Sequence, residues 1–152
     1  EEQIKLFRQL WSRDRVSFSL AKERFKGVGI SPRSNGEAIP IWIGVSPEPP
    51  VQALERIGRS ADGWFTMSRV DQFESQHKVV LESVKRSGRS ISDISVEAEV
   101  SIANLASENF ISQVKRWQDL GVSHISLSTL GLEGDSSSHL KLLARALEFL
   151  GK

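Results

Sequence analysis

From Ile39 onward the chain alternates short apolar runs with amphipathic stretches, and no other feature limits its possible folds as much. The apolar runs cover residues 39–44, 64–67, 94–103 and 122–129. Each is followed by a stretch whose apolar residues recur every three or four positions, as on a helix with one buried face. The first run is nearly continuous, which is typical of a strand buried on both faces of a parallel sheet. The pattern predicts four strands, each followed by a helix.

The segment before Ile39 follows a different pattern. Apolar residues spaced by three, four and seven positions predict a helix over residues 3–12. Alternating stretches at 16–18 and 24–26 predict an exposed β-hairpin. Residues 30–37 are rich in Ser, Pro, Asn and Gly, which interrupt both periods, so we expect a loop there.

The repeated strand-helix order indicates parallel strands joined by crossover helices, because strand centres lie roughly 25 to 35 residues apart. Such units build both doubly wound sheets and eight-stranded barrels, and the period alone does not separate the two. A complete barrel takes about 250 residues. With 152 residues, the chain has room for one domain and for about half of such a barrel.

The charge balance and the cysteine content exclude several classes of function. Twenty Lys and Arg residues against 19 Asp and Glu residues give a net charge of +1, too small a field to indicate nucleic acid or an anionic membrane surface as partner. No apolar run approaches the roughly 20 residues of a transmembrane helix. The chain has no Cys, which excludes a disulfide framework and a thiolate metal site and favours a cytoplasmic location.

The turn after the first apolar run, Gly44 to Pro47, leads toward a helix. Backbone amides at such a turn, with the helix dipole behind them, are able to hold a phosphate group. Gly44 would let a ligand approach the backbone closely, and the Ser46 hydroxyl would add a hydrogen bond. The same turn also fits an ordinary strand-to-helix connection with Ser46 as the helix cap.

Histidines and paired carboxylates give no firm catalytic or metal site. We expect His77 to be a core or boundary residue, His124 to be half-buried in a strand, and His139 to be solvated. Glu97 and Glu99 share one face of the third strand. They could form an acid-base pair or simply line the wet side of the sheet. We therefore assign no catalytic residue and predict no metal site.

Six segments carry a recognisable combination of motifs: Leu10-Trp11, Val16-Ser17-Phe18, Phe25-Lys26-Gly27, Ile39 to Gly44, Arg56 to Phe65 and Leu120 to Ile125. Together they resemble the luciferase-like monooxygenase family, which includes FMN-dependent and deazaflavin F420-dependent oxidoreductases. Family members carry a Pro-Ile-Trp-Ile-Gly-Gly run, a helix ending in Ala-Arg-x-Ala-Asp-Gly-Trp, and an upstream Leu-Trp helix with a Val-Ser-Phe and Phe-Lys-Gly hairpin. The resemblance spans nearly the whole chain.

The resemblance implies an α/β fold, a partial TIM (β/α)8 barrel of about four parallel β/α units preceded by a helix and a β-hairpin. We expect a single domain over residues 1–152, with the helix, hairpin and loop in 1–38 and the C-terminal half-barrel in 39–152. The chain would then be a fragment or a shortened member. Its two outer strands would expose unpaired backbone groups. We expect a second copy to cover them, making a homo-oligomer; the alternative is an open sheet with residues 3–28 folded over its edge.

The resemblance also implies a flavin- or F420-dependent oxidoreductase or monooxygenase acting on a small-molecule substrate, with FMN or coenzyme F420 at the carboxyl ends of the strands. The cofactor-binding positions of the family map to Gly44, Val45, Ser46, Asp62, Gly63 and Trp64. Val45 stands where the family usually has a second glycine, so its side chain is expected to crowd a phosphate. The alternative function is a non-catalytic half-barrel module for assembly or for residual binding of a phosphate-bearing ligand.

Overall fold

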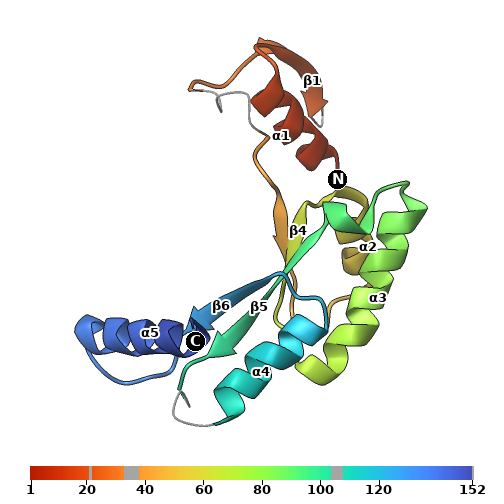
Figure 1. The fold of residues 1–152 in the computed structure, drawn as a ribbon. Coiled ribbons are helices and arrows are strands. Elements are labelled where there is room, and N and C mark those ends of the chain that lie inside the picture. Colours follow the sequence, from red (N-terminus) through yellow and green to blue (C-terminus); the bar gives the residue numbers. More distant parts are fainter. Residues whose placement is uncertain (21, 33–37, 104–107, 152) are drawn as a thin grey trace.

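The computed structural model describes residues 1–20, 22–32, 38–103 and 108–151, and Figure 1 shows their arrangement. The chain opens with helix α1 (Glu2–Ser12) and an antiparallel hairpin of β1 (Val16–Leu20) and β2 (Glu23–Val28). Both elements confirm the sequence prediction. Residues 33–37 of the predicted loop lie outside the described residues.

The remaining strands form one parallel sheet in the order β3-β4-β5-β6. The strands are β3 (Trp42–Gly44), β4 (Gly63–Thr66), β5 (Ser95–Ser101) and β6 (His124–Ser128), and the helices are α2 (Val51–Ser60), α3 (Val70–Arg86), the 3-10 turn η1 (Ile91–Asp93), α4 (Glu108–Asp119) and α5 (Ser136–Leu150). In the described part of the chain, β3 and β6 are the two edges of an open sheet. The predicted α/β partial barrel is confirmed.

The first strand differs from its prediction. Only residues 42–44 pair as a strand, and Trp42 and Ile43 are half-buried rather than buried on both faces. Ile39 is 42% exposed. The apolar run indicated two covered faces, but β3 is an edge strand with a neighbour on one side only, so the prediction of full burial is wrong.

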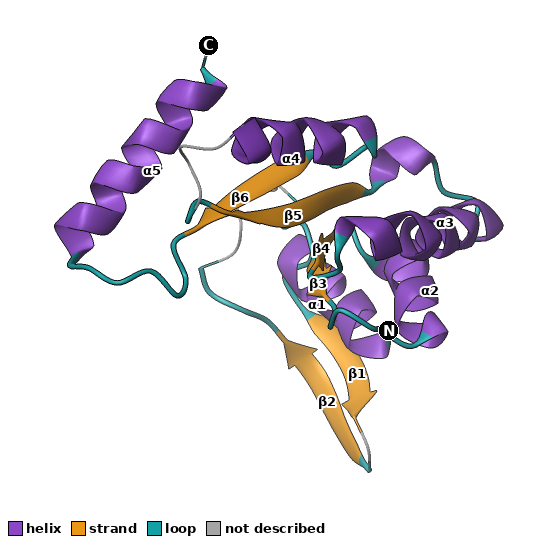
Figure 2. Ribbon diagram, turned by 90° about the horizontal axis from the view of Figure 1, so that it is seen from below, coloured by secondary structure: helices purple, strands orange, loops and turns teal. Residues whose placement is uncertain are grey.

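Helices α2, α3 and α4 lie on one side of the sheet (Figures 1 and 2). The residues of β5 that face this side, Val96, Ala98 and Val100, are buried, and the alternate residues Glu97 and Glu99 face the other, concave side. This is the alternation predicted from the sequence. The hydrophobic core therefore fills the layer between the sheet and the three helices, and the concave face remains more polar.

Side chains of the two edge strands meet across the concave face at the amino-terminal end of the sheet. The Trp42 ring on β3 meets the His124 ring on β6 edge-on, with 5.2 Å between ring centroids. Trp42 lies directly over Gly63, where an added Cβ would be 2.5 Å from its ring. The glycine thus makes room for an indole that spans the concave face.

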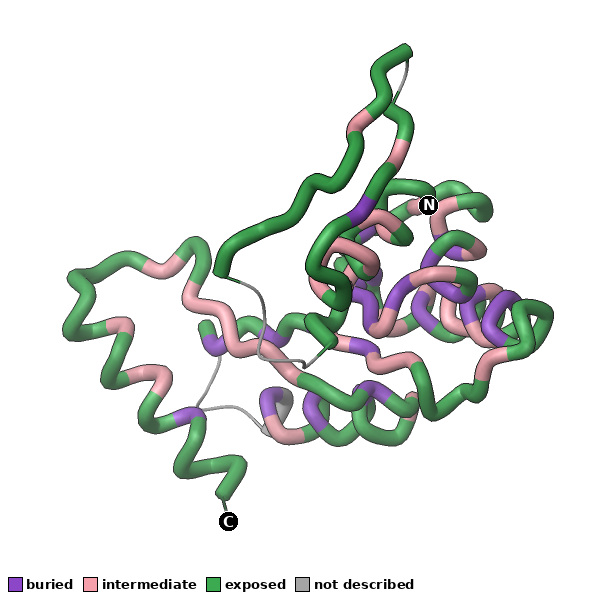
Figure 3. Tube along the Cα trace, turned by 90° about the horizontal axis from the view of Figure 1, so that it is seen from above, coloured by how far each residue is buried: buried purple, intermediate pink, exposed green. Residues whose placement is uncertain are grey.

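Helix α5 is only partly covered. Ala146 is buried, and Leu142 and Leu143 pack against the core. Leu140 and Leu147 lie two turns apart on the neighbouring side of the helix. Their exposed fractions are 66% and 62%. Figure 3 shows α5 extending from the body of the molecule with most of its trace exposed. The predicted helix is present, but half of its apolar face has no cover among the described residues.

The amino-terminal unit is anchored at the end of the sheet where β4 begins. Arg8 on α1 donates to the carbonyl of Ser60 at 2.9 Å and to the carboxylate of Asp62 at 2.8 Å. Glu1 pairs with Arg59 at 2.6 Å. The hairpin projects away from the sheet (Figure 2). These contacts hold the unit at one end of the sheet rather than along an edge strand, so they do not support the alternative in which residues 3–28 cover an edge.

The close crossing of α2 and α3 depends on Gly58. A Cβ at this position would lie 2.6 Å from the Val80 carbonyl oxygen and 2.8 Å from the Val84 nitrogen. Small Ser83 faces it, and the Ser83 hydroxyl donates to the carbonyl of Glu55 at 2.7 Å. None of the helices in the described residues is long and apolar enough to cross a membrane.

We predict that Gly58→Ala lowers the free energy of unfolding by about 1–3 kcal/mol, because backbone atoms of α3 must move to admit the methyl group. This loss is expected despite the higher helix propensity of alanine, about 1 kcal/mol. Urea denaturation followed by circular dichroism measures it. The control is Gly44→Ala, where a Cβ would meet no atom within 4 Å. A Gly58 variant as stable as that control would contradict the packing.

Candidate functional site

Loops after β3, β4 and β6 meet the carboxyl-terminal edge of the sheet, where parallel α/β folds bind ligands. Residues 45–50 follow β3, residues 67–69 follow β4, and residues 129–135 follow β6. Helices α2 and α3 begin at this edge, so their positive dipole ends face it. Residues 104–107, after β5, lie outside the described residues.

The turn Gly44 to Ser46 lies at the carboxyl end of the edge strand β3. Gly44 and Ser46 are exposed, and a Cβ at Gly44 would meet open space. The Val45 side chain is 8% exposed and belongs to the core on the helix side. It therefore does not crowd the open space at Gly44, contrary to our expectation. The Val45 N–H donates to the carbonyl of Phe65 at 3.2 Å, so this amide is already used by the sheet.

Helix α2 begins at Val51, directly after the prolines Pro49 and Pro50, where the sequence places its start. Its N-cap is Pro50, which offers no side-chain hydrogen bond. Ser46 is therefore not the helix cap, and residues 45–50 form a separate loop. This loop leaves the Ser46 hydroxyl at the exposed rim.

A small polar network ties the loop after β3 to the loop after β4. The carbonyl of Pro47 accepts hydrogen bonds from the Ser68 hydroxyl at 3.1 Å and from the Gln76 side-chain amide at 2.9 Å. Ser68 is buried, and its hydroxyl also contacts the Gln76 side-chain oxygen. Sequence reasoning missed both residues. The position of Ser68 could have indicated it, because Ser68 follows the second apolar run as Ser46 follows the first.

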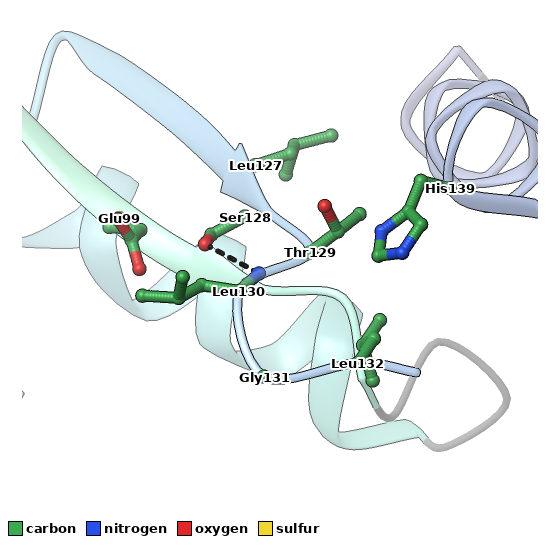
Figure 4. A pocket seen from close by; sticks show the side chains of 8 residues that line it. All are labelled: Glu99, Leu127, Ser128, Thr129, Leu130, Gly131, Leu132 and His139. Carbon is green, nitrogen blue, oxygen red and sulfur yellow. Dashed lines mark hydrogen bonds between the residues drawn. The ribbon is translucent and has the colours of Figure 1, made fainter. Parts of the chain in front are cut away.

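An open cleft of about 560 Å³ lies at the carboxyl end of β5 and β6 (Figure 4). It is lined by Glu99, Leu127, Ser128, Thr129, Leu130, Gly131, Leu132 and His139. The Leu130 N–H donates to the Ser128 hydroxyl at 3.2 Å, and the Leu130 side chain is 85% exposed. The cleft is therefore of mixed character, with leucine side chains beside hydroxyl groups, one carboxylate and one imidazole.

His139 reaches this cleft because α5 begins at a side-chain cap. The Asp135 carboxylate accepts hydrogen bonds from the Ser138 amide at 2.8 Å and the Ser138 hydroxyl at 2.6 Å. These bonds lower the pKa of Asp135 below its ordinary value. His139 is half-buried rather than fully solvated as expected. Sequence reasoning did not connect it with Glu99, since the two are far apart along the chain.

The structure does not bring Asp62 and Gly63 to the same end of the sheet as Gly44 to Ser46. Asp62 immediately precedes β4 at the amino-terminal end, and its carboxylate accepts from the Ile41 N–H at 2.8 Å as well as from Arg8. Gly63 lies under Trp42. The contacts of Asp62 and Gly63 give both residues a structural role at this end of the sheet. Their role in binding a cofactor stays a prediction.

Trp64 is completely buried on the helix side of β4. Its ring stacks on Phe73, with 5.7 Å between centroids, and His77 stacks on Phe73 at 4.9 Å. The Trp64 indole N–H and the His77 Nδ1 atom are buried without a hydrogen-bond partner among the described residues. Burial lowers the pKa of His77. Trp64 therefore faces the core rather than the concave side.

His124 is exposed, not half-buried, although its ring contacts Trp42. The Ser123 hydroxyl lies 3.0 Å from its Nδ1 atom. Across the described residues, no group of three or more His, Asp or Glu side chains is arranged to hold a metal ion.

Comparison with known proteins identifies relatives. The family model described as luciferase-like monooxygenase matches residues 1–110. No protein with a curated description matches the sequence significantly.

Three solved structures are similar in fold. An F420-dependent secondary alcohol dehydrogenase, in complex with an F420-acetone adduct, has 13% identity and a TM-score of 0.68 over 83% of this chain and 54% of that one. The coenzyme F420-dependent tetrahydromethanopterin reductase from Methanopyrus kandleri has 16% identity and a TM-score of 0.69 over 93% and 60%. Monooxygenase RslO1 from Streptomyces bottropensis has 15% identity and a TM-score of 0.50 over 95% and 43%. The chain thus spans little more than half of the first two.

We predict that Asp62→Ala lowers the free energy of unfolding by about 1–2 kcal/mol, because the part-buried Ile41 N–H loses its acceptor. Chemical denaturation measures the change. Glu74→Ala, on the exposed side of α3, is the control and should stay within about 0.5 kcal/mol of the wild type. Equal effects of the two substitutions would show that Asp62 does not hold the sheet together.

We predict that His77 makes stability fall in mild acid. A half-buried neutral imidazole with a lowered pKa contributes fully to the free energy of unfolding above the unfolded-state pKa of about 6.5. The contribution is lost as the pH falls below that value, with a slope of at most about 1.4 kcal/mol per pH unit. Unfolding measured between pH 8 and pH 5 should therefore be less pH-dependent in His77→Phe than in the wild type. Parallel profiles would contradict the burial argument.

Proposed function

The chain belongs to the luciferase-like monooxygenase family, and on this premise we propose that it is the part of a deazaflavin- or flavin-dependent oxidoreductase that holds the phosphate-bearing end of the cofactor. The family match over residues 1–110 carries the proposal, because this range includes both the turn at Gly44 and the loop at Ser68. We propose coenzyme F420 ahead of FMN, since two of the similar structures are described as F420-dependent.

The residues at the carboxyl end of β3 fit a phosphate group in two respects. The open space at Gly44 lets an anion reach the backbone, and the exposed Ser46 hydroxyl can donate a hydrogen bond to it. The dipole ends of α2 and α3 add partial positive charge at this edge. The Val45 amide takes no part, since it bonds to Phe65.

The Pro47, Ser68 and Gln76 network would keep the two rim loops in register. A loop that is already fixed loses less conformational entropy when it binds a ligand. Ser68 and Gln76 would therefore act as positioning residues, without touching the cofactor.

The cleft beside β6 would receive the small-molecule substrate. Its leucine side chains offer apolar surface, and its hydroxyl groups offer hydrogen bonds, to a bound substrate. Glu99 and His139 are the ionisable side chains on its walls, and they would be the groups that hold or move a proton for a bound substrate. The cofactor, when bound, would supply the hydride chemistry.

We predict that the purified chain binds coenzyme F420 in the micromolar range, measured by the fluorescence of the cofactor in a titration or by equilibrium dialysis, with FMN titrated in parallel. Ser46→Asp places a negative charge against the phosphate and should weaken binding at least about tenfold, or about 1.4 kcal/mol. Gly44→Val should have an effect of similar size, because its side chain fills the open space.

The matched control is Ser92→Asp. It adds the same charge to an exposed serine in η1, at the opposite end of the sheet, and should leave affinity unchanged. Indifference of the wild-type chain to both cofactors would contradict the proposal and favour the non-catalytic module. Equal weakening by Ser46→Asp and Ser92→Asp would place the binding site elsewhere.

A further inference from the structure

We propose that the amino-terminal end of the sheet carries an anion site, formed by Lys5, Arg8, Arg59 and Arg89, that takes the phosphate group of a small molecule. These four basic side chains line one cavity. The cavity lies at the end of the sheet opposite to the turn at Gly44, so the proposal does not rest on the proposed function.

The cavity has a volume of about 260 Å³ and lies between three segments that are far apart in the sequence. Figure 1 shows α1 at this end of the sheet, beside α2. The described lining consists of Ile4, Lys5 and Arg8 on α1, Arg59 and Ser60 in the last turn of α2, and Arg89 in the loop after α3. It contains four basic side chains and no acidic one. Because sites for drug-sized ligands take roughly 300–1,000 Å³, this cavity suits a smaller ligand.

Structural hydrogen bonds hold two of the guanidinium groups in place. Arg8 donates to the Ser60 carbonyl at 2.9 Å and to the Asp62 carboxylate at 2.8 Å. Arg89 donates to the carbonyl of Gly58 at 2.9 Å, and its second terminal nitrogen donates to a further carbonyl at 3.1 Å. A guanidinium group has five N–H donors, so these bonds leave donors for a ligand. Groups that are already fixed lose little conformational entropy on binding.

Positive charge exceeds negative charge around the cavity. Three carboxylates, those of Glu1, Glu55 and Asp62, pair with basic side chains here at distances between 2.6 and 3.7 Å. Arg86 pairs with Glu55 and joins the four basic residues of the cavity, so five cations stand against three anions. The carboxyl ends of α2 and α3 add only about half a negative charge each. Since the net charge of the chain is +1, the remaining positive charge is a local feature.

Lys5 is the residue that structural contacts do not explain. Arg8 and Arg89 bond to carbonyl groups at the end of α2, and Arg59 pairs with carboxylates. The ammonium group of Lys5, by contrast, has neither a hydrogen bond nor an ion pair with the described residues, although Lys5 lines the same cavity. An anion held between Lys5 and the guanidinium groups would supply the missing negative charge.

The arrangement of the donors favours phosphate over carboxylate. A phosphate monoester carries nearly two negative charges and three acceptor oxygens, so it can bond to side chains from three segments at once. A carboxylate has only two oxygens and one charge. Charge-assisted hydrogen bonds of this kind are about twice as strong as bonds between neutral groups. Ile4 offers an apolar contact to the organic group that carries the phosphate.

The first experiment titrates the chain with inorganic phosphate by calorimetry at low ionic strength. Ser46→Asp is the background, because it blocks the phosphate position proposed at the other end of the sheet. We expect a dissociation constant below about 1 mM. Adding Lys5→Glu should weaken binding at least about tenfold, since it reverses a charge at the cavity without removing a described bond. Circular dichroism checks that each variant is folded.

The matched control is Lys115→Glu, which makes the same charge change at an exposed position of α4. It should leave the affinity for phosphate unchanged. Equal weakening by Lys5→Glu and Lys115→Glu would show that only the total charge matters and would overturn the proposal. The absence of phosphate binding in the Ser46→Asp background would overturn it as well.

The second experiment compares ligands in the same background. Glycerol 3-phosphate should bind more tightly than inorganic phosphate, because its organic group can contact Ile4. Succinate carries two charges on carboxylates and should bind more weakly than either. Tighter binding of inorganic phosphate would limit the site to the free ion and contradict the organic part of the proposal. Succinate binding as tightly as the phosphate ligands would contradict the choice of phosphate.

These readouts are separate from the test of the cofactor. Lys5→Glu in the otherwise wild-type chain should leave the affinity for F420 unchanged, because Lys5 lies at the opposite end of the sheet from Ser46. A chain that binds phosphate through Lys5 but binds neither F420 nor FMN would contradict the proposed function and support this site. A chain that binds F420, but no phosphate in the Ser46→Asp background, would do the reverse.

Discussion

Asp62 connects the start of the parallel sheet with the amino-terminal helix. Its carboxylate accepts from the Ile41 N–H ahead of β3 and from Arg8 on α1, and its backbone bonds to the Ile41 carbonyl and to the Ser95 amide of β5. One residue therefore fixes the register of three strands and attaches the amino-terminal unit. Because these bonds lie at the amino-terminal end of the sheet, the opposite end is free to carry loops that differ in length and chemistry.

The two ends of the sheet therefore have different roles. This difference explains why the residues predicted to bind the cofactor lie at opposite ends of the sheet. Asp62 and Gly63 belong to the end that holds the sheet together, where the glycine admits Trp42 and the carboxylate caps a strand. Gly44 and Ser46 belong to the end that is exposed and open. A motif that recurs within a family can therefore mark a structural requirement as readily as a ligand contact. Here the contacts of each residue, rather than its place in a motif, distinguish the two roles.

Periodicity in the sequence was enough to find the four strands and four α-helices that the structure describes in the half-barrel, but not the short 3-10 helix η1. The alternation of Val96, Ala98 and Val100 against Glu97 and Glu99 even identified the buried side of β5 correctly. The predictions that failed depend on which elements lie next to each other in the fold, and the sequence period does not reveal this. The first apolar run does not reveal that β3 lies at an edge, and the leucines of α5 do not reveal which of them find a partner. Ser68 and Glu99 became part of the rim only through contacts distant along the chain, which no local pattern contains.

The open sheet has a core because its helices cover one face completely, whereas the concave face carries Glu97, Glu99, Ser126 and His124. Burying this polar face would cost free energy unless water or a ligand stayed in contact with it. The stability of the sheet therefore comes from the layer of helices on its other face, where the apolar side chains are buried. A concave face that stays hydrated leaves the carboxyl-terminal end of the strands accessible, which is the condition that a ligand site at Gly44 and Glu99 requires.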